Sequence, residues 1–472
     1  MNEPSDIAVD EPAEKPAGLP LRDEEGHIEP TWIEQLRGLI AAGDAQDIAE
    51  AMAPLHAADT GDVLEALDPE ARLALVRLLG DRFDFEALTE VDESVRSELI
   101  EELSNAQIAR GVAGLDSDDA VAILEDIEQQ DRDDILSKMP AFERLSLRRS
   151  LDYPEDSAGR RMQTDFIAIP PFWTVGQTID YLRNERDLPD EFYQIYVVDA
   201  GYSLLGTVPL DKFLRTKRPA KIEDFMQTDV IEIEASQDQE EAARTFERYD
   251  LVEVAVVDDG KRLVGVLTID DMVDVIHEEA TEDMQKLAGV GDEDLSDGVV
   301  DAVRSRTTWL VVNLVTALLA SIVIGLFDAT IEQMVALAVL MPMVASMGGN
   351  AGTQTMTVTV RALAMRELDS FKLRRLVSRE ILVGFFNGGI FAVLLGALTI
   401  VRFGDLGLGI VIGLAMITNM IAAGTAGVLI PLTLDRFKID PAVASSTFVT
   451  TITDVIGFFA FLGLAGLWFH LF

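Results

Sequence analysis

The stretch Thr447-Phe-Val-Thr-Thr-Ile-Thr-Asp-Val-Ile-Gly457 opens the last of five apolar segments. Within it Thr447, Thr450, Thr451 and Asp454 follow helical spacings of three and four, which predicts one polar stripe. Asp454 is the only acid that we place deep inside these segments. A carboxylate at bilayer depth costs roughly 2.5 to 3.5 kcal/mol, so it normally faces a partner or a water-filled path. We therefore expect Asp454 to bind a cation. The alternative is an Asp capped by a neighbouring hydroxyl inside a packed bundle.

The five apolar segments are each long enough to cross a bilayer, which takes about 20 residues. They lie at about 309–327, 334–360, 381–401, 406–434 and 442–468. Basic residues gather before the first segment, between the second and third, and between the fourth and fifth. The positive-inside bias predicts a multi-pass protein of the plasma (inner) membrane, with its N-terminus in the cytoplasm and its C-terminus outside.

The second segment contains Pro342 and the run Gly348-Gly-Asn-Ala-Gly-Thr-Gln354. Proline and paired glycines weaken a helix, and non-helical backbone at membrane depth is tolerated where it is buried or lines water. We expect freed carbonyls and the Asn350 side chain to be oxygen donors for a cation. A close-packed seam of small residues is an equally weighted reading. We expect Asn387 and Asn419 to form hydrogen bonds between helices.

The charge of the 472-residue chain is unevenly divided, because residues 1–303 hold 27 Lys and Arg against 73 Asp and Glu. Residues 304–472 hold 11 against 9. A polyanion of this kind suits small cations and argues against nucleic acid as a partner. The sequence has no cysteine and four scattered histidines, and no nucleophile and base pair is visible, so we do not expect an enzyme.

The first 150 residues divide into two parts. Residues 1–30 are rich in proline and acids and predict a disordered leader, whereas residues 31–150 predict an acidic domain of short helices. A faint repeat sixty residues apart pairs Arg72 with Arg132. Asp116, Asp118 and Asp119 stand at a predicted helix start, where capping of the helix is a more probable role than metal binding.

Two landmarks recur in residues 151–276. Met162-Gln-Thr-Asp returns as Met226-Gln-Thr-Asp, and Gly206-Thr-Val-Pro-Leu-Asp211 returns as Gly265-Val-Leu-Thr-Ile-Asp270. Strands are predicted at 195–199, 204–208, 254–258 and 263–267. The pattern predicts tandem α/β units at 151–220 and 221–276. They resemble the cystathionine-β-synthase (CBS) type of regulatory domain. That resemblance implies a possible ATP or other adenine nucleotide site at Thr268 and Asp270, whereas Pro209 argues against a matching site at Asp211.

An acidic stretch follows the second α/β unit and leads into a connecting helix predicted at 277–303. Asp271, Asp274, Glu278 and Glu282 are spaced by three, four and four, which places like charges on one helix face. Such a run is usually only a solvated face. Its position between the α/β pair and the first membrane segment favours a function.

The whole arrangement resembles the MgtE family of magnesium channels and transporters. Its most specific marks are Tyr153-Pro-Glu-Asp-Ser-Ala-Gly159, Glu279-Ala-Thr-Glu-Asp283, the Gly348–Gln354 run and Asp454-Val-Ile-Gly457. The resemblance implies a homodimer with an all-α superhelical domain, a CBS pair, a connecting helix that plugs the gate, and a five-helix transmembrane domain at 304–472. It makes Asp454 the pore carboxylate. The acids it implies for regulatory Mg²⁺ are Asp238, Glu240, Asp250, Asp271, Asp274, Glu279, Glu282 and Asp283, with Asp116, Asp118 and Asp119 as looser candidates.

The function expected from these features is Mg²⁺ uptake that is inhibited by cytoplasmic Mg²⁺. An ion-coupled secondary transporter of Mg²⁺, Co²⁺ or Mn²⁺ that uses the same Asp454 is the alternative. A membrane-tethered sensor without transport is a third reading, but it would need no buried acid in the bilayer.

Overall fold

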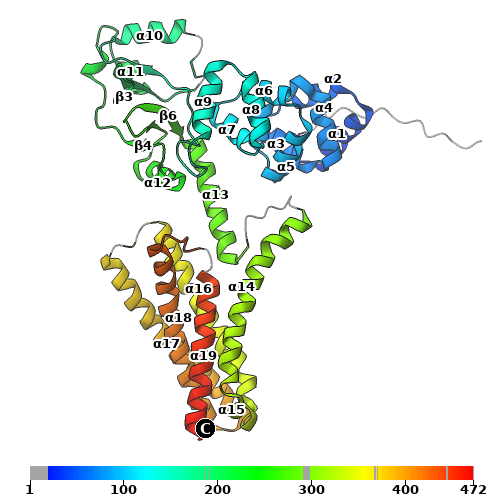
Figure 1. Cartoon of the computed structure of the whole chain (residues 1–472), viewed down its shortest axis with the longest axis vertical. Helices are drawn as coiled ribbons and strands as arrows, with labels where there is room; N and C mark the ends of the chain where they lie inside the picture. Colours follow the sequence, from blue (N-terminus) through cyan, green and yellow to red (C-terminus); the bar gives the residue numbers. More distant parts are fainter. Residues whose placement is uncertain are drawn as a thin grey trace, which may run out of the picture. The chain divides into compact units, whose positions relative to one another are not determined.

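The computed structural model describes residues 20–185, 188–189, 191–290, 298–365, 368, 370–442 and 445–470. These residues divide into two compact units between Glu278 and Glu279 (Figure 1). The first unit holds a helical domain and the two tandem α/β units, which we call the CBS pair after the family that they resemble. The second unit holds the long apolar helices.

The helical domain is a succession of short amphipathic helices around one continuous apolar core. Its helices are α1 (Pro30–Ala42), α2 (Ala45–Met52), α3 (Ala57–Ala66), α4 (Pro69–Leu79), α5 (Glu93–Glu102), α6 (Asn105–Val112), α7 (Ser117–Glu125), α8 (Gln129–Lys138) and α9 (Ala141–Leu151), with the 3-10 turns η1 (Gly80–Arg82) and η2 (Phe85–Leu88). Arg72 donates to the carbonyls of Leu64 and Leu67, at 2.8 and 3.1 Å. Arg132 donates in the same way to Glu125 and Ile127, at 3.0 and 2.8 Å. The repeat sixty residues apart therefore has a structural basis.

The predicted leader differs from the structure at its C-terminal end. Residues 1–19 lie outside the described residues. Arg22, however, forms a β-bridge with Ile28 and donates to Asp59 on α3 at 2.6 Å. Residues 21–29 therefore fold against the helical domain because one guanidinium pairs with its acids.

The CBS pair contains two three-stranded sheets of the same topology. In the first, β1 (Ala168–Ile169) pairs in parallel with β2 (Gln194–Val198), which pairs antiparallel with β3 (Leu204–Pro209). In the second, β4 (Glu232–Glu234), β5 (Glu253–Val257) and β6 (Leu263–Thr268) repeat this order. The remaining elements are α10 (Val175–Asn184), α11 (Leu210–Arg215), η3 (Ile222–Asp224) and α12 (Gln239–Tyr249). The predicted strands are confirmed to within one residue.

The repeated Met-Gln-Thr-Asp segments explain why the two CBS units form a pair. Gln163, which precedes the first sheet, exchanges two backbone hydrogen bonds of 2.8 Å with Val266 on the edge of the second. Gln227 does the same with Thr207 on the edge of the first sheet, at 2.8 and 2.9 Å. A methyl group at Gly265 would lie 2.7 Å from the Gln163 carbonyl, so this close approach needs glycine.

The predicted connecting helix, 277–303, is not one helix. Helix α13 begins directly after β6 and covers Ile269–Ala288, and α14 begins at Val299. Residues 291–297 lie outside the described residues. Gly289 follows α13 with a φ of 72°, a left-handed conformation that favours glycine and ends the helix there.

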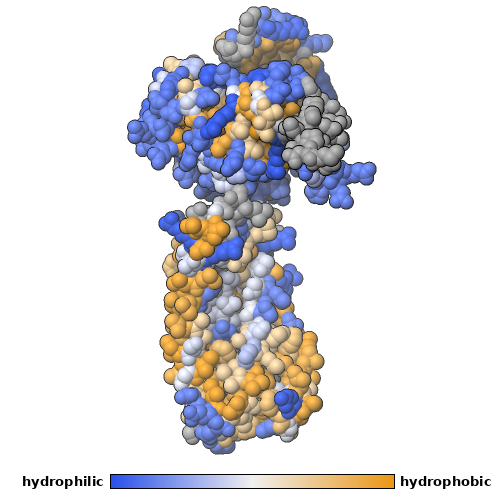
Figure 2. All heavy atoms as spheres, turned by 90° about the vertical axis from the view of Figure 1, so that its right-hand side faces the viewer, coloured by the Kyte–Doolittle hydropathy of each residue, from blue (hydrophilic) through white to orange (hydrophobic). Residues whose placement is uncertain are grey.

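The second unit contains α14 (Val299–Gly325), α15 (Asp328–Gln333), α16 (Ala336–Ala364), α17 (Ser370–Phe403), α18 (Leu406–Arg436) and α19 (Ser445–Phe469). Among the described residues, α14, α17, α18 and α19 are long and apolar enough to cross a membrane. Five spans were predicted. The 29-residue α16 is long enough but more polar than these four, because the Gly348–Thr359 part carries amides and hydroxyls. Figure 2 shows that apolar residues cover much of the face of this unit that is turned to the viewer.

The predicted helix break in α16 is wrong. The helix is continuous through Pro342 and Gly348. Its small residues face neighbouring helices. A methyl group at Gly352 would lie 2.4 Å from Val449 on α19, and one at Gly427 on α18 would lie 2.7 Å from the Gly352 carbonyl oxygen. The packed-seam reading of these glycines is therefore supported, because close helix contacts compensate for their weak helix propensity.

Candidate cation sites

Acids from three parts of the sequence come together in the first unit, at η2, at the start of α7 and at the start of α13. We name this group the acid cluster; it comprises Glu86, Glu90, Asp116, Asp118, Asp119, Asp271 and Asp274. Two hydrogen bonds from the first Met-Gln-Thr-Asp segment hold α7 in place. The Thr164 amide donates to Ser117 Oγ at 2.6 Å, and Gln163 Nε2 donates to Asp118 Oδ2 at 3.2 Å.

Asp118 and Asp271 are the central pair of the acid cluster. Asp118 is 9% exposed, and its Oδ1 accepts no hydrogen bond from the described residues. Asp271 Oδ2 accepts a hydrogen bond from the Thr268 hydroxyl. Burial raises the pKa of both carboxyls. The charge of Asp119 raises the pKa of Asp118 further, and the charge of Asp118 raises that of Asp271, whereas a hydrogen bond between the two carboxyls lowers the pKa of Asp118. Two carboxylates in this position repel each other when both are ionised.

The other acids of the cluster add negative charge around Asp118 and Asp271. Burial, and then the charge of Asp271, raise the pKa of Asp119 to about 7. Burial also raises the pKa of Glu90, with a further contribution from the charge of Asp274. Burial raises the pKa of Asp274 as well, although His277 and Arg161 counteract it. Arg161 donates to Glu278 at 2.7 Å, so it balances part of the charge at the edge of the cluster.

The acid cluster is an open set of carboxylates. Among the described residues no group of three Asp, Glu or His side chains is close enough to hold a metal ion directly. Mg²⁺ suits such an open set, because it keeps several waters and is usually bound by one or two carboxylates. A bound cation would offset the repulsion between Asp118 and Asp271.

Three predicted regulatory acids have local roles around α12. Asp238 caps the helix by accepting from the Glu240 and Glu241 amides at 3.0 and 3.3 Å. Glu240 pairs with Arg244 one turn later. Asp250 ends the helix with a φ of 51°. The structure does not bring these three acids into the acid cluster.

The last predicted acids lie on the C-terminal part of α13, in the second unit. Glu279 and Asp283 are half-buried there. Glu282 pairs with Lys286, whose Nζ also lies 2.9 Å from Asp440 Oδ2 in the loop between α18 and α19. Burial lowers the pKa of Lys286, but the hydrogen bonds to Glu282 and Asp440 outweigh it and raise the pKa.

The adjacent Leu287 packs on an apolar group from three helices of the second unit. The group contains Met356 and Val360 of α16, Ile430 of α18 and Val449 of α19, with Ala442 of the α18–α19 loop. The end of α13 therefore rests on the ends of the membrane helices. Sequence reasoning missed the partner Asp440, because it lies 154 residues from Lys286.

Asp454 is half-buried on α19, and Asn350 is exposed on α16. Thr450 and Thr451 donate their hydroxyl hydrogens to the carbonyls of Ser446 and Thr447, at 2.9 and 2.6 Å. These two hydroxyls are used within α19, which argues against a cap on Asp454. Thr447 is buried and donates to Asn313 on α14 at 2.9 Å, so the predicted polar stripe is not wet along its whole length.

Glu380 is a second acid inside a candidate span, which corrects the expectation that Asp454 is alone. It lies on α17 and is 6% exposed. It accepts from the Thr355 hydroxyl at 3.0 Å and from Arg379 at 2.7 Å. The predicted third segment began one residue later, at Ile381. Glu380 therefore links α16 to α17 with its charge balanced, and it does not offer a free carboxylate.

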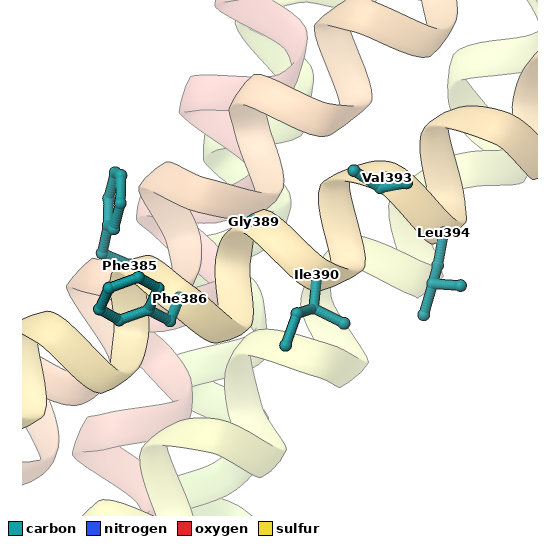
Figure 3. A pocket seen from close by; sticks show the side chains of 6 residues that line it. All are labelled: Phe385, Phe386, Gly389, Ile390, Val393 and Leu394. Atoms are coloured by element: carbon teal, nitrogen blue, oxygen red, sulfur yellow. The ribbon is translucent and has the colours of Figure 1, made fainter.

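A hollow on α17 has no ligands for a cation. Figure 3 shows its lining, which consists of hydrocarbon side chains around Gly389; these are Phe385, Phe386, Ile390, Val393 and Leu394. All of them lie on one helix. The hollow suits a contact with lipid chains.

The predicted nucleotide residues lie at the end of β6. Thr268 is buried, and its hydroxyl is used by Asp271. Asp270 is exposed at the start of α13. The pKa of the exposed Tyr193 is raised by Glu191 first, then by burial and by the charge of Asp270. Tyr193 and Asp270 are thus close enough for the charge of Asp270 to affect the pKa of the Tyr193 hydroxyl.

Comparisons with known proteins agree with this organisation. Residues 55–156 match the MgtE intracellular N domain, residues 222–278 match the CBS domain, and residues 341–464 match the divalent cation transporter domain called MgtE. The magnesium transporter MgtE of Bacillus subtilis (strain 168) is 30% identical over 434 residues, which cover 92% of this chain and 96% of that protein.

The magnesium transporter MgtE of Thermus thermophilus is also 30% identical, over 441 residues that cover 92% of this chain and 97% of that protein. A solved cytosolic domain of the Mg²⁺ channel MgtE in complex with ATP is 25% identical. It covers 52% of this chain and 99% of its own, with a TM-score of 0.47.

Proposed function

Because the chain belongs to the MgtE family of magnesium transporters, we propose that it lets Mg²⁺ enter the cell passively and closes when cytoplasmic Mg²⁺ rises. We also propose that the protein is a homodimer in the plasma membrane and that its N-terminus lies in the cytoplasm. The acid cluster is the observation that supports regulation by Mg²⁺.

The regulatory step uses the repulsion within the acid cluster. When Mg²⁺ is scarce, ionised Asp118 and Asp271 disfavour the contact between α7 and α13. Mg²⁺ between them stabilises that contact, so it shifts the population toward the arrangement in which α7 and α13 are docked. Moving a gate from 1:99 to 99:1 takes about 5.5 kcal/mol of differential binding, which several weak sites together supply.

The closing step uses the C-terminal end of α13. Leu287 on the apolar group and Lys286 beside Asp440 hold this end against α16, α18 and α19. In the proposed closed state this contact blocks the cytoplasmic end of the cation path. Opening requires that both contacts break.

The conducting step uses few ligands. Asp454 supplies the charge, and the Asn350 amide is a neutral oxygen donor on α16. A largely hydrated Mg²⁺ needs only a few such contacts. A second copy of the chain would bring a second Asp454 to the same axis, which would match the charge of one divalent ion.

ATP binding by the CBS pair is a separate part of the proposal. It is supported by the exposed Asp270, whose carboxylate suits a ribose hydroxyl, and by the exposed Tyr193, whose ring suits stacking on a base and whose pKa is affected by the charge of Asp270. Isothermal titration of the purified chain with ATP tests this part, and Asp270→Ala should remove the heat of binding.

The test of transport and regulation is electrical recording from inside-out patches that contain the purified chain. We expect a Mg²⁺ current that follows the Mg²⁺ gradient without any H⁺ or Na⁺ gradient, and that falls when Mg²⁺ on the cytoplasmic face rises from micromolar to millimolar. Flux that requires a H⁺ or Na⁺ gradient would instead establish a coupled transporter. A current that ignores cytoplasmic Mg²⁺ would remove the regulatory part.

A further inference from the structure

Asn419 lies where α16, α18 and α19 meet in the second unit, which we call the membrane unit from here on. It is on α18, is 0% exposed, and donates through Nδ2 to the Val344 carbonyl of α16 at 2.9 Å. This hydrogen bond between helices confirms the prediction for Asn419.

Two glycines make room for this side chain. A methyl group at Gly348 of α16 would lie 2.1 Å from Asn419 Nδ2, and one at Gly457 of α19 would lie 2.7 Å from it. Both distances are far below van der Waals contact, so α16 and α19 reach the amide only because each has glycine at this position. One side chain of α18 thus sets how closely two other helices approach it.

The Asn419 amide also has a polar atom, Oδ1, that its contacts with the other helices do not use. Asn419 Oδ1 is buried and accepts no hydrogen bond from any residue in the described parts of the chain. A buried acceptor without a partner costs free energy, and an apolar side chain would avoid that cost. Helix packing alone therefore does not account for an asparagine here.

The glycines that contact Asn419 adjoin the residues of the proposed cation path. Gly348 precedes Asn350 by two residues on α16. Gly457 follows Asp454 by three residues, so the two lie about one turn apart on neighbouring parts of the same face of α19. A shift of either glycine away from α18 would move the adjacent path residue with it, because each helix is continuous there.

We propose that Asn419 is a positioning residue that sets the separation of α16 and α19 and thereby the selectivity of the cation path. This inference rests on the proposed path between Asn350 and Asp454. A path of fixed width passes Mg²⁺ with its waters and discriminates by hydrated size and charge. Without the amide, the two helices have space to settle at another separation, and ions that differ in size and hydration then pass more readily.

The experiment measures Mg²⁺ and Ca²⁺ fluxes into proteoliposomes that contain the full chain. We expect Asn419→Ala to raise the Ca²⁺ to Mg²⁺ flux ratio severalfold. Asn387→Ala, an exposed asparagine of α17, is the matched control and should keep the wild-type ratio. A change of ratio identifies a change of the path, since loss of folded protein lowers both fluxes together.

A pair of variants tests the contact itself. Gly348→Ala should lower the Mg²⁺ flux by about tenfold or more, because its methyl group collides with the amide. Gly348→Ala with Asn419→Ala removes the collision and should recover most of the Mg²⁺ flux while keeping the relaxed ratio. Asn419→Ser, which retains a smaller hydrogen-bond donor, replaces the alanine variant if the latter does not fold.

Two outcomes would overturn the inference: a wild-type Ca²⁺ to Mg²⁺ ratio in folded Asn419→Ala, or no recovery in the double variant. Asp454→Asn in the same vesicles separates this failure from that of the proposed path. If Asp454→Asn abolishes flux and the Asn419 variants behave as wild type, only the positioning role is wrong. If Asp454→Asn retains full flux, the proposed path is wrong.

Discussion

The acid cluster and the membrane unit hold buried carboxylates in different surroundings. In the cluster, Asp118 and Asp271 lie against each other, with further acids around them. In the membrane unit, Glu380 is paired with Arg379 and Thr355, and Asp454 lies apart from it on another helix. Crowded acids repel and respond to a cation by changing their arrangement. A separated acid attracts a cation without needing one for its fold, which suits a path that an ion must also leave.

Among the variants that test this difference, we expect Asp454→Asn to have the largest effect. Removing the one charge that offsets the cost of a cation at membrane depth should lower Mg²⁺ flux by about 100-fold, the equivalent of roughly 2.5 to 3.5 kcal/mol. The chain should fold normally, because Asn has nearly the same shape. Flux into proteoliposomes checks this, with Asp328→Asn, an exposed residue at the start of α15, as a control that should conduct normally. Wild-type flux through Asp454→Asn would contradict it.

The next test removes the two central carboxylates of the acid cluster. Asp118→Asn combined with Asp271→Asn should leave the conducting path intact but flatten the Mg²⁺ dependence of the current, by about tenfold or more in the ratio between low and high cytoplasmic Mg²⁺. Asp238→Asn is the matched control: the residue caps α12, and Asn is also a good cap, so inhibition should be nearly unchanged. Patch recordings with normal inhibition in the double variant would show that the cluster is not the sensor.

The third test uses pH. In the absence of Mg²⁺ the docked cluster holds protons up to about pH 7 at Asp119, well above the ordinary Asp value of 3.8, so docking is most stable at low pH and weakens as pH rises through this window. Mg²⁺ must displace those protons. Its affinity should therefore rise with pH, by about tenfold per unit for each proton displaced, most steeply below pH 7, and level off only above about pH 9, where Asp271 is ionised as well.

Calorimetry in buffers of different ionisation enthalpy measures the protons released. Release should be larger at pH 6.5 than at pH 8.5. The Asp118→Asn, Asp271→Asn variant is the control for release from this cluster. Equal release at both pH values would mean that the cluster is already ionised before Mg²⁺ binds.

The smallest expected effect concerns the end of α13. Lys286→Asp should weaken the contact with Asp440 and raise the current at high cytoplasmic Mg²⁺ by about fivefold, since a partly exposed ion pair contributes about 1 kcal/mol. Asp440→Lys alone should act similarly. The double reversal, Lys286→Asp with Asp440→Lys, should restore closure. If the two single effects merely add in the double variant, the pair does not hold the gate.

Local patterns predicted much of this fold, and distant contacts account for what they missed. The strands of the CBS pair and the hydrogen bond of Asn419 follow from alternation, repeats and the cost of a polar group in a helix bundle. The α16 break was wrong because the weak helix propensity of its glycines was given more weight than their packing against α18 and α19. The Asp118–Asp271 pair joins residues 153 positions apart, and no periodicity reports such a meeting.

The acids around α12 show that a sequence pattern can also predict a cation site that the fold does not assemble. Asp238, Glu240 and Asp250 had the composition expected of a cation site. A helix start, a pair one turn apart and a helix end are equally good uses of an acid, and the structure places these three acids in those roles. Composition predicts which residues are able to bind a cation, whereas the fold decides which of them meet.

Gln163 and Gln227 each form backbone hydrogen bonds with the sheet of the other CBS repeat. These bonds have a consequence for shortened versions of the protein. Each sheet ends in a strand, β3 or β6, whose outer edge is covered by a segment that belongs to the other repeat. Separating the repeats at about residue 220 would uncover both edges at once, and uncovered edges recruit strands from other molecules. A fragment holding a single repeat should therefore self-associate, so shorter versions of this chain need to begin before Met162 and continue past β6.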